Sequence, residues 1–432
     1  MPDALPLLAP ATGNARSDLL LGLSGGLDST ALLHRLARDA RLDNGRLRAL
    51  HVHHGLHADA DGWAAHCQWT CEALGIPLAV IRVAVEHRGE GLEAAAREAR
   101  YAAFADALRD GELLVTAHHL DDQAETFLLR ALRASGPDGL AAMRPWRAFA
   151  RGWHWRPLLE TPRAALLDYA RRHRLQWIDD PANASLDFDR NFLRRQVMPL
   201  LRARWPQADA AFARSAALSA QASELLDTED EAALASCATL DAHAIAVAPL
   251  LALPAARRAR ALRRWIQRLD LPPLPGQAIA RIESDLLSAR GDGEPVFRWG
   301  QAQLRRWRDL LYAARVVPPL TQDWQAGWDG RGRLLLPDGG ALSLQGADAL
   351  PAAAWVTARR GGERIRLPGR AHSHALKKVL QDLGVPPWER ERLPLLRDAA
   401  GDVLAAGDLV HAAGFDAWLR ANGARLAWSR AG

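Results

Sequence analysis

Short apolar runs alternate with amphipathic stretches along the first 200 residues. The runs predict β-strands; they lie at residues 18–23, 47–53, 76–85 and 112–117. Apolar positions at helical spacing predict helices between these strands; the stretches lie at 30–40, 61–74 and 92–109. Strands that alternate with helices form parallel sheets with helices on both faces, because the crossovers are right-handed. The pattern therefore predicts an α/β fold that binds ligands beyond the carboxyl ends of its strands.

A glycine-rich turn follows the first predicted strand and leads into the first helix. It comprises Ser24, Gly25, Gly26, Leu27, Asp28 and Ser29. Glycines let the backbone bend tightly and approach a phosphate, and a helix start offers unpaired N–H groups and a favourable dipole. Asp28 adds a hard oxygen ligand suited to Mg²⁺. The alternative is an ordinary capped turn, since Ser and Asp are common helix caps.

Two groups of histidines fall at the ends of predicted strands. His51 and His53 lie in the last part of the second strand and His54 follows it, and His118 and His119 follow the fourth. The chain lacks zinc-finger spacing, so packing or nucleotide contact is favoured over a bound transition metal.

Asp122 and Glu125 are three residues apart directly after the fourth strand, and they share one face of the helix that begins there. Asp-x-x-Glu before an apolar run also resembles a capping box. From spacing alone, the capping and functional interpretations have equal weight. A pair of carboxylates at a strand end beside a phosphate loop can hold an ammonium group or accept its proton.

Basic residues gather in three places along the chain. A solvated helix face is the usual explanation of such runs, but a run without acids also favours phosphate or RNA contact. The segment 188–195 opens a basic helix that we expect to end near Met198–Pro199. The segment 254–268 contains six arginines and no acid, and the segment 359–378 contains one acid, Glu363. The candidate nucleic-acid contacts are Arg190, Arg194, Arg195, Arg257, Arg258, Arg359, Arg360, Lys377 and Lys378.

Composition narrows the classes of protein. The 432 residues have a formal net charge of +5, which is compatible with a polyanionic partner. Three cysteines form no disulfide framework, no signal peptide is evident, and no stretch approaches a membrane span. We therefore expect a cytoplasmic protein without a membrane partner. Lys377 and Lys378 are the only lysines, so an amine used by the N-terminal part must come from outside.

The length allows two or three domains. We expect a catalytic parallel-sheet domain over 1–210 and a mainly helical, arginine-rich domain over 211–320. Proline and glycine then indicate a linker and hairpin over 321–351, before a small α+β domain over 352–432. The sequence does not decide between a monomer and a homodimer.

The turn at 24–29 resembles the Ser-Gly-Gly-x-Asp-Ser loop of the PP-loop ATP pyrophosphatases, an adenine nucleotide α-hydrolase-like fold. Together with the motifs at 51–61, 116–126 and 177–194, it is similar to the bacterial tRNA(Ile)-lysidine synthetases. The resemblance implies an enzyme that uses ATP and Mg²⁺ to adenylate the wobble cytidine of tRNA(Ile) with a CAU anticodon. Free L-lysine then attacks C2, which gives lysidine and changes decoding from AUG to AUA. The longer members of this family also carry a C-terminal domain that helps to hold the tRNA, and residues 359–408 are similar to it.

Three alternatives remain open. A related cytidine thiolase would need paired cysteines, and no Cys-x-x-Cys occurs in the chain. A synthetase for a small metabolite would not need the arginine-rich appendages. A non-catalytic RNA-binding protein would not need an intact phosphate loop.

Overall fold

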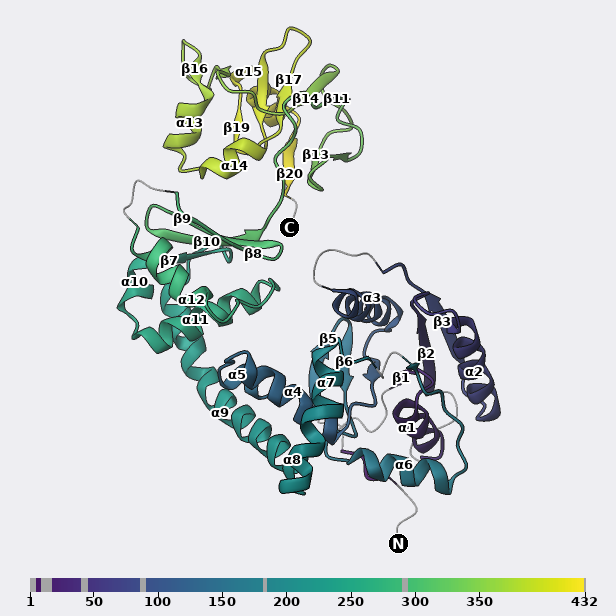
Figure 1. Ribbon diagram of the computed structural model, residues 1–432. Helices are drawn as coiled ribbons and strands as arrows, with labels where there is room; N and C mark the ends of the chain where they lie inside the picture. Colours follow the sequence, from purple (N-terminus) through teal and green to yellow (C-terminus); the bar gives the residue numbers. More distant parts are fainter. Residues whose placement is uncertain are drawn as a thin grey trace. The chain divides into compact units, whose positions relative to one another are not determined.

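A six-stranded sheet with the order β3-β2-β1-β4-β6-β5 forms the centre of the N-terminal part (Figure 1). The computed structural model describes residues 5–8, 18–39, 46–85, 91–181, 185–289 and 294–430. Neighbouring strands are parallel except β5 and β6, which are antiparallel. The strands are β1 (Leu19–Gly22), β2 (Leu47–His53), β3 (Leu78–Arg82), β4 (Leu113–Val115), β5 (Trp146–Phe149) and β6 (Gly152–Trp155). The predicted parallel α/β fold is confirmed.

Both faces of this sheet are buried, which explains why its central strands are apolar at successive positions. Leu19 and Leu21 of β1 belong to the core formed with helices α1 (Leu27–Ala37), α2 (Ala60–Ala73) and α6 (Arg163–Arg172). Leu20, between them, belongs to a second core with α3 (Leu92–Ala107) on the opposite face. Alternation of side chains along a strand thus sends the residues of one run into two cores.

The strand order reverses at β1. From β1, the chain adds β2 and β3 on one side and then returns to place β4 on the other. In open parallel sheets, ligands bind at such a reversal, beyond the carboxyl ends of the two central strands. The glycine-rich turn follows β1 and the motif at 116–126 follows β4, so this topology brings both to one edge.

Some elements differ from the sequence prediction. The hairpin β5–β6 was not predicted, although β6 extends the sheet beside β4. The basic helix expected to end near Met198–Pro199 instead continues as α7 (Asp189–Phe192), a π-helical turn η2 (Leu193–Val197) and α8 (Met198–Arg204). Pro199 lies directly after the π-helical turn, in the first turn of α8. Residue 40 of the first predicted helix and Asn183 of the third motif lie outside the described residues.

The chain divides into two compact units, Met1–Thr228 and Glu229–Gly432. The second begins within the long helix α9 (Ala208–Cys237) and contains α10 (Val247–Ala252), α11 (Ala255–Arg268), α12 (Ala278–Arg281) and η3 (Ile282–Leu287). A four-stranded antiparallel sheet of the order β7-β10-β9-β8 packs with these helices in one core. Its strands are β7 (Ala244–Ala246), β8 (Val296–Trp299), β9 (Ala302–Trp307) and β10 (Leu310–Arg315). The helices agree with the prediction, but the sheet was missed because its short strands show little alternation.

The rest of the second unit combines small antiparallel sheets with short helices. One sheet has the order β11-β14-β17-β18-β19, and another has the order β12-β13-β20. The strands are β11 (Gln325–Trp328), β12 (Leu334–Leu335), β13 (Ala341–Gln345), β14 (Ala354–Thr357), β17 (Leu395–Arg397), β18 (Val403–Ala406), β19 (Val410–His411) and β20 (Arg425–Ser429). A two-stranded pair, β15 (Arg364–Ile365) and β16 (His374–Ala375), precedes α13 (Leu376–Asp382); α14 (Pro387–Arg392) and α15 (Ala413–Ala421) complete this part.

The segment 321–351, expected as linker and hairpin, is part of this fold. The hairpin is present as β12–β13. Trp328, Leu336, Leu342 and Leu350 are buried in the same core as residues of β14 and β17. The segment therefore packs with residues 352–430 and does not separate them from the rest of the unit.

The close approach of β6 to the start of β4 gives a stability prediction. A Cβ atom on Gly152 would lie 2.0 Å from the backbone oxygen of Glu112. We expect Gly152→Ala to lower the free energy of unfolding by about 1–3 kcal/mol, because the two strands would have to separate. Denaturant titration measures the change. Gly62→Ala is the control, since its Cβ would meet nothing within 4 Å and alanine favours its helix. An unchanged Gly152→Ala protein would contradict the packing of these strands.

Candidate active site

The turn after β1 has the backbone geometry of a phosphate-binding loop. Gly25 has φ +84°, and a Cβ there would lie 2.8 Å from Ile178 Cδ1 and 3.0 Å from Cys67 Sγ. The amide of Ile178 donates to the oxygen of Gly25 at 2.9 Å, so the motif at 177–194 is hydrogen-bonded to the loop. Glycine is therefore required by conformation and by space.

The loop opens on the N-terminus of α1. Gly26 is the N-cap and has no side chain to bond the first-turn amides, which stay available for an anion. Ser29 Oγ donates to the oxygen of Gly26 at 3.1 Å and lies 3.0 Å from Ser24 Oγ. These contacts within the protein fix the positions of the two hydroxyl groups in the loop. This arrangement fits the predicted role of residues 24–29 in nucleotide binding.

Helix α4 (Leu120–Leu132) begins at the end of β4 and is capped by His119. The side chain of Asp122 accepts from the amide of His119 at 3.2 Å, and in the neutral ring the amide of Asp122 donates to His119 Nδ1 at 3.4 Å. The capping box is therefore formed by His119 and Asp122. The pairing of Asp122 with Glu125, considered from the sequence as a capping box, does not occur, and Glu125 has another role.

His119 is the centre of a cluster of carboxylates. Its Nε2 lies 3.6 Å from Asp28 Oδ2 and 3.5 Å from Asp122 Oδ2, and its Nδ1 lies 3.7 Å from Asp121 Oδ2. Burial alone would lower the pKa of His119, but the charges of Asp122, Asp28 and Asp121 together raise it above its usual value. His119 thus connects the phosphate loop to α4 through one imidazole ring.

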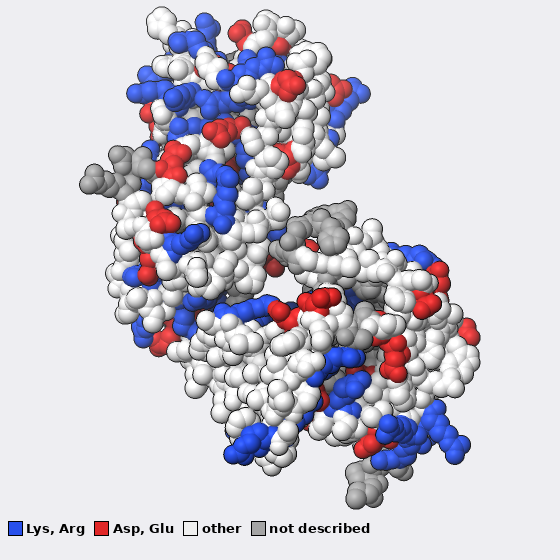
Figure 2. Space-filling model, viewed as in Figure 1, with Lys and Arg blue, Asp and Glu red and all other residues white. Residues whose placement is uncertain are grey.

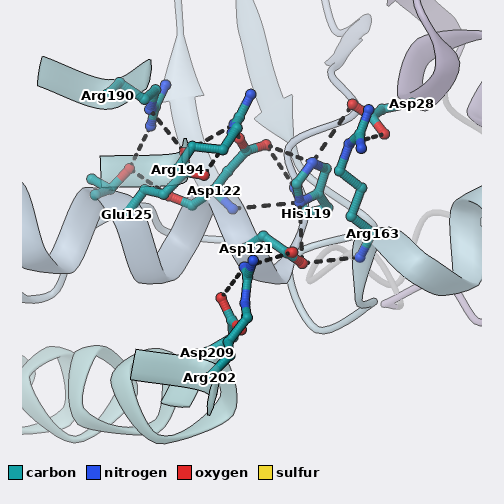
Figure 3. A network of polar contacts seen from close by, with 11 residues as sticks. Asp28, His119, Asp121, Asp122, Glu125, Arg163, Arg190, Arg194, Arg202 and Asp209 are labelled. Carbon is teal, nitrogen blue, oxygen red and sulfur yellow. Dashed lines mark hydrogen bonds and ion pairs between the residues drawn. The ribbon is translucent and has the colours of Figure 1, made fainter. Parts of the chain in front are cut away.

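Asp122 and Glu125 lie together and bind the same arginine (Figure 3). Arg194 Nε donates to Glu125 Oε1 at 2.7 Å, and its Nη2 donates to Glu125 Oε2 and to Asp122 Oδ1, both at 2.9 Å. Arg190 Nε lies 3.4 Å from Glu125 Oε2. The sequence placed the two arginines among candidate nucleic-acid contacts and did not indicate that they meet these acids.

The two carboxylates differ in their proton affinity. Burial raises the pKa of Asp122, but the positive charge around it, from His119 and His118 first, lowers it to about 2. Glu125 has no exposed surface, and burial raises its pKa against the opposing hydrogen bonds from Arg194. One acid therefore stays charged at neutral pH, while the other takes up a proton more readily.

The network extends to α6, α8 and α9. Arg163, at the start of α6, lies 3.6 Å from Asp28 Oδ1, and its amide donates to Asp121 at 2.9 Å. Arg202 bonds Asp121 at 3.1 Å and Asp209 at 2.6 Å. Sequence reasoning missed Asp121, Arg163 and Arg202, although Asp121 lies directly beside Asp122 in the motif.

His51, His53 and the cysteines Cys67 and Cys71 make contacts that explain them by packing and hydrogen bonding. His51 Nδ1 lies 2.9 Å from the oxygen of Leu23, and His53 Nε2 lies 3.1 Å from Asp61. Within the residues that the structure describes, no group of three or more His, Cys, Asp or Glu side chains is arranged to hold a metal ion. Cys67 and Cys71 are buried, and burial raises the pKa of their thiols to about 12 and about 11. These thiols are poor nucleophiles.

Five of the six arginines of α11 are paired with acids that lie elsewhere in the chain. Arg257 lies 2.8 Å from Glu229, and Arg258 lies 2.9 Å from Glu283. Asp230 and Glu231 of α9 bind Arg260, Arg264 and Arg268 in the same way. The absence of acids within 254–268 therefore did not mean the absence of acids in space, and contact of Arg257 and Arg258 with RNA stays a prediction.

The basic residues near α13 are more exposed. Lys377 and Lys378 are exposed on α13, whereas Arg359 is paired with the buried Glu363 at 3.3 Å. Arg360 donates to the oxygen of Gln322 at 2.8 Å and is exposed, as is Arg195 of η2. Figure 2 shows basic side chains gathered over the C-terminal part that Figure 1 labels α13 and β16.

Comparison with known proteins agrees with this architecture. A family model described as PP-loop domain matches residues 5–201. Models described as TilS substrate binding domain and TilS substrate C-terminal domain match residues 246–312 and 355–428. A protein named tRNA(Ile)-lysidine synthase from Xanthomonas axonopodis pv. citri is 56% identical, over 99% of this chain and 96% of that protein. The chain belongs to the tRNA(Ile)-lysidine synthase family.

More distant tRNA(Ile)-lysidine synthases match over the same length. The protein of that name from Xylella fastidiosa strain 9a5c is 52% identical, over 95% of this chain and 94% of its own. The one from Escherichia coli O157:H7 is 41% identical, over 95% of this chain and 96% of its own. The PP-loop match implies the use of ATP. Among the described residues, no helix is both long and apolar enough to cross a membrane.

The environment of His119 gives a prediction for the pH dependence of stability. Because the folded-state pKa of His119 is raised above 6.5, its protonation stabilises the folded protein fully below pH 6.5, and this contribution is lost as pH rises through the folded pKa. The difference in unfolding free energy between wild type and His119→Gln should therefore shrink as pH rises above 6.5. Denaturant titrations between pH 5 and pH 9 measure it.

His34 provides a control of opposite sign. Burial, with the charges of His173 and Arg38, lowers its pKa to about 4. The contribution of its neutral form is present above pH 6.5 and is lost as pH falls toward 4. The difference in unfolding free energy between wild type and His34→Gln should decrease as pH falls below 6.5. The same trend in both variants would contradict the raised pKa of His119.

Proposed function

We propose that this protein ligates L-lysine to C2 of the wobble cytidine in the CAU anticodon of tRNA(Ile), in the cytoplasm, and so produces lysidine. The observation that supports this function best is the position of a phosphate loop and a buried carboxylate pair at one strand reversal, joined by His119. Membership of the tRNA(Ile)-lysidine synthase family gives the class of substrate.

The reaction has two steps. The C2 oxygen of cytosine attacks the α-phosphorus of ATP, and the bond to pyrophosphate breaks. The ε-amine of lysine then attacks C2, loses a proton, and displaces the oxygen as AMP. ATP, lysine and tRNA are thereby converted to lysidine-tRNA, AMP and pyrophosphate.

The loop at 24–29 supplies the groups that the first step needs. First-turn amides of α1 and the hydroxyl groups of Ser24 and Ser29 can donate to phosphate oxygens as negative charge moves to pyrophosphate. Asp28 fits a Mg²⁺ ligand, because its Oδ1 is buried and accepts no hydrogen bond in the structure. Mg²⁺ is commonly held by one or two carboxylates together with substrate phosphates, and it would neutralise charge on the phosphates there.

Asp122 and Glu125 supply the groups that the second step needs. An ionised Asp122 attracts the lysine ammonium, and the raised pKa of Glu125 suits a carboxylate that accepts a proton. We therefore assign lysine binding to the pair and proton removal to Glu125. A cytidine thiolase is disfavoured by the buried, protonated thiols of Cys67 and Cys71.

Transfer of labelled lysine tests this function. The protein, incubated with bacterial tRNA, ATP and radiolabelled lysine, should place the label in one nucleoside. Asp122→Asn should raise the KM for lysine about tenfold to a hundredfold and that for ATP much less, because it removes a hydrogen-bonded charge. Asp168→Asn, which changes an exposed acid on α6, is the control. If Asp122→Asn loses only thermal stability, its role is limited to capping α4.

The exposed lysines of α13 are proposed to hold the body of the tRNA. Phosphate contacts add affinity without reading sequence, and each one lost reduces the salt slope of binding by about one. Replacing Lys377 and Lys378 by Ala should therefore raise the KM for tRNA, reduce the salt slope by about two, and leave kcat unchanged. Removal of the C-terminal domain is a poorer test, since residues 320–350 share its core.

Arg315 and Arg420 provide the matched control for the two lysines. Both are exposed, but each is paired with an acid, Asp270 at 3.7 Å and Asp416 at 2.9 Å. Replacing both arginines by Ala removes the same two positive charges as the lysine variant. It should change the salt slope of tRNA binding much less, because each arginine already has an acidic partner. Equal effects of the two double variants would show that only net charge matters.

A further inference from the structure

Arg194 fills the place where the proposed function puts the lysine ammonium. Its guanidinium makes three hydrogen bonds to Asp122 and Glu125, all of 2.7–2.9 Å (Figure 3). Both oxygens of Glu125 are used, and Asp122 Oδ2 accepts from the start of α4. An ammonium group has three donors and needs these same oxygens. Lysine and Arg194 therefore cannot both bind the pair in this geometry.

A count of charges also indicates that lysine and Arg194 exclude each other at the carboxylate pair. The pair carries two negative charges, and Arg194 and Arg190 supply two positive charges. The wider network joins five carboxylates to four arginines and His119, which is the fifth positive charge when protonated. An added ammonium would leave one uncompensated positive charge in a buried place, which is unfavourable unless a cation leaves.

Arg194 is the cation best placed to leave. Its side chain is 32% exposed, whereas Glu125 is fully buried. It lies on the π-helical turn η2, between the buried Leu193 and Met198. Such turns are short irregularities within helices and are often found at functional sites. The helix can thus stay anchored while the guanidinium turns away from the acids.

The phosphate loop offers the nearest destination. His119 Nε2 lies within 3.6 Å of both Asp122 and Asp28, so one ring separates the carboxylate pair from the loop. ATP would add several negative charges at that loop, and arginine binds phosphate oxygens well.

We propose that Arg194 competes with lysine for Asp122 and Glu125, and that the phosphates of ATP draw it away. ATP thereby opens the lysine site, and the two ligands bind cooperatively. This inference rests on the proposed assignment of lysine to the carboxylate pair. Coupling between two binding sites is reciprocal, so lysine must tighten ATP binding by the same factor.

Equilibrium binding without tRNA tests the inference. Lysine affinity is measured calorimetrically for wild type and Arg194→Gln, with and without α,β-methylene ATP, which cannot be cleaved between these phosphates. In wild type, the nucleotide analogue should tighten lysine binding about tenfold, within the usual range of such coupling. In Arg194→Gln, lysine should bind about tenfold more tightly than in wild type when no nucleotide is present, and the analogue should add little.

Arg204→Gln is the matched control. Arg204 ends α8 and is exposed over the ring of Trp205, so its loss removes one positive charge without touching the acids. Its lysine affinity and nucleotide coupling should equal those of wild type. Thermal unfolding provides a second measurement, because lysine should raise the Tm of Arg194→Gln more than that of wild type by replacing the lost cation.

The outcomes separate the inference from the function on which it rests. Lysine that binds wild type and is lost in Asp122→Asn supports the assignment of the site. If Arg194→Gln then binds lysine no more tightly than wild type, or keeps the full nucleotide coupling, Arg194 is not the competitor and the inference is overturned. If wild type with the analogue binds no lysine, the assignment of lysine to the pair fails first.

Discussion

The burial of Glu125 is the constraint on which the arrangement of the site depends. A carboxylate without exposed surface is costly unless it is neutralised and fully hydrogen-bonded. Helix α4 offers no base at the right place, so the cations come from η2 and α7, nearly 70 residues later in the chain. The need to neutralise this one side chain therefore fixes the basic helical segment against α4. It also explains why the motif at 188–195 occurs in the same unit as the phosphate loop.

The sequence predicted the local features of the site. It did not predict which distant segments of the chain contact one another. Gly25 and the strand before it identified the loop because the pattern of residues determines the turn directly. Asp122 and Glu125 were found as a pair because three residues separate neighbours on a helix face. Their partner Arg194 was assigned to RNA, since no local signal shows which side chains a basic helix meets. The sequence also did not show that Arg257 and Arg260 of α11 meet acids on α9, and contact of Arg257 with RNA stays a prediction. The hairpin β5–β6 and the sheet β7–β10 were missed because their strands are short and gain stability from neighbours.

Charge is used in different ways in the two units. In the first, arginines and carboxylates form a closed, partly buried network around the site. In the second, most arginines of α11 are compensated, whereas Lys377 and Lys378 lie exposed on α13. Compensated pairs hold helices together and add little long-range field, and uncompensated exposed cations attract a polyanion from a distance. The same local excess of bases thus serves packing in one helix and is available for RNA in another.

The choice of arginine as the resident cation follows from the chemistry proposed for the site. A pocket that binds an ammonium group between two carboxylates has to be neutralised when that group is absent. A lysine of the protein would do so, but it would also present an amine beside an activated base and could replace the substrate. Arginine neutralises the same carboxylates with more hydrogen bonds and stays protonated, so it is no nucleophile. Both lysines of this chain lie in the second unit, at 377 and 378, and the unit that contains the site has none. The selectivity of the amine transfer is therefore consistent with a site whose own cations cannot react.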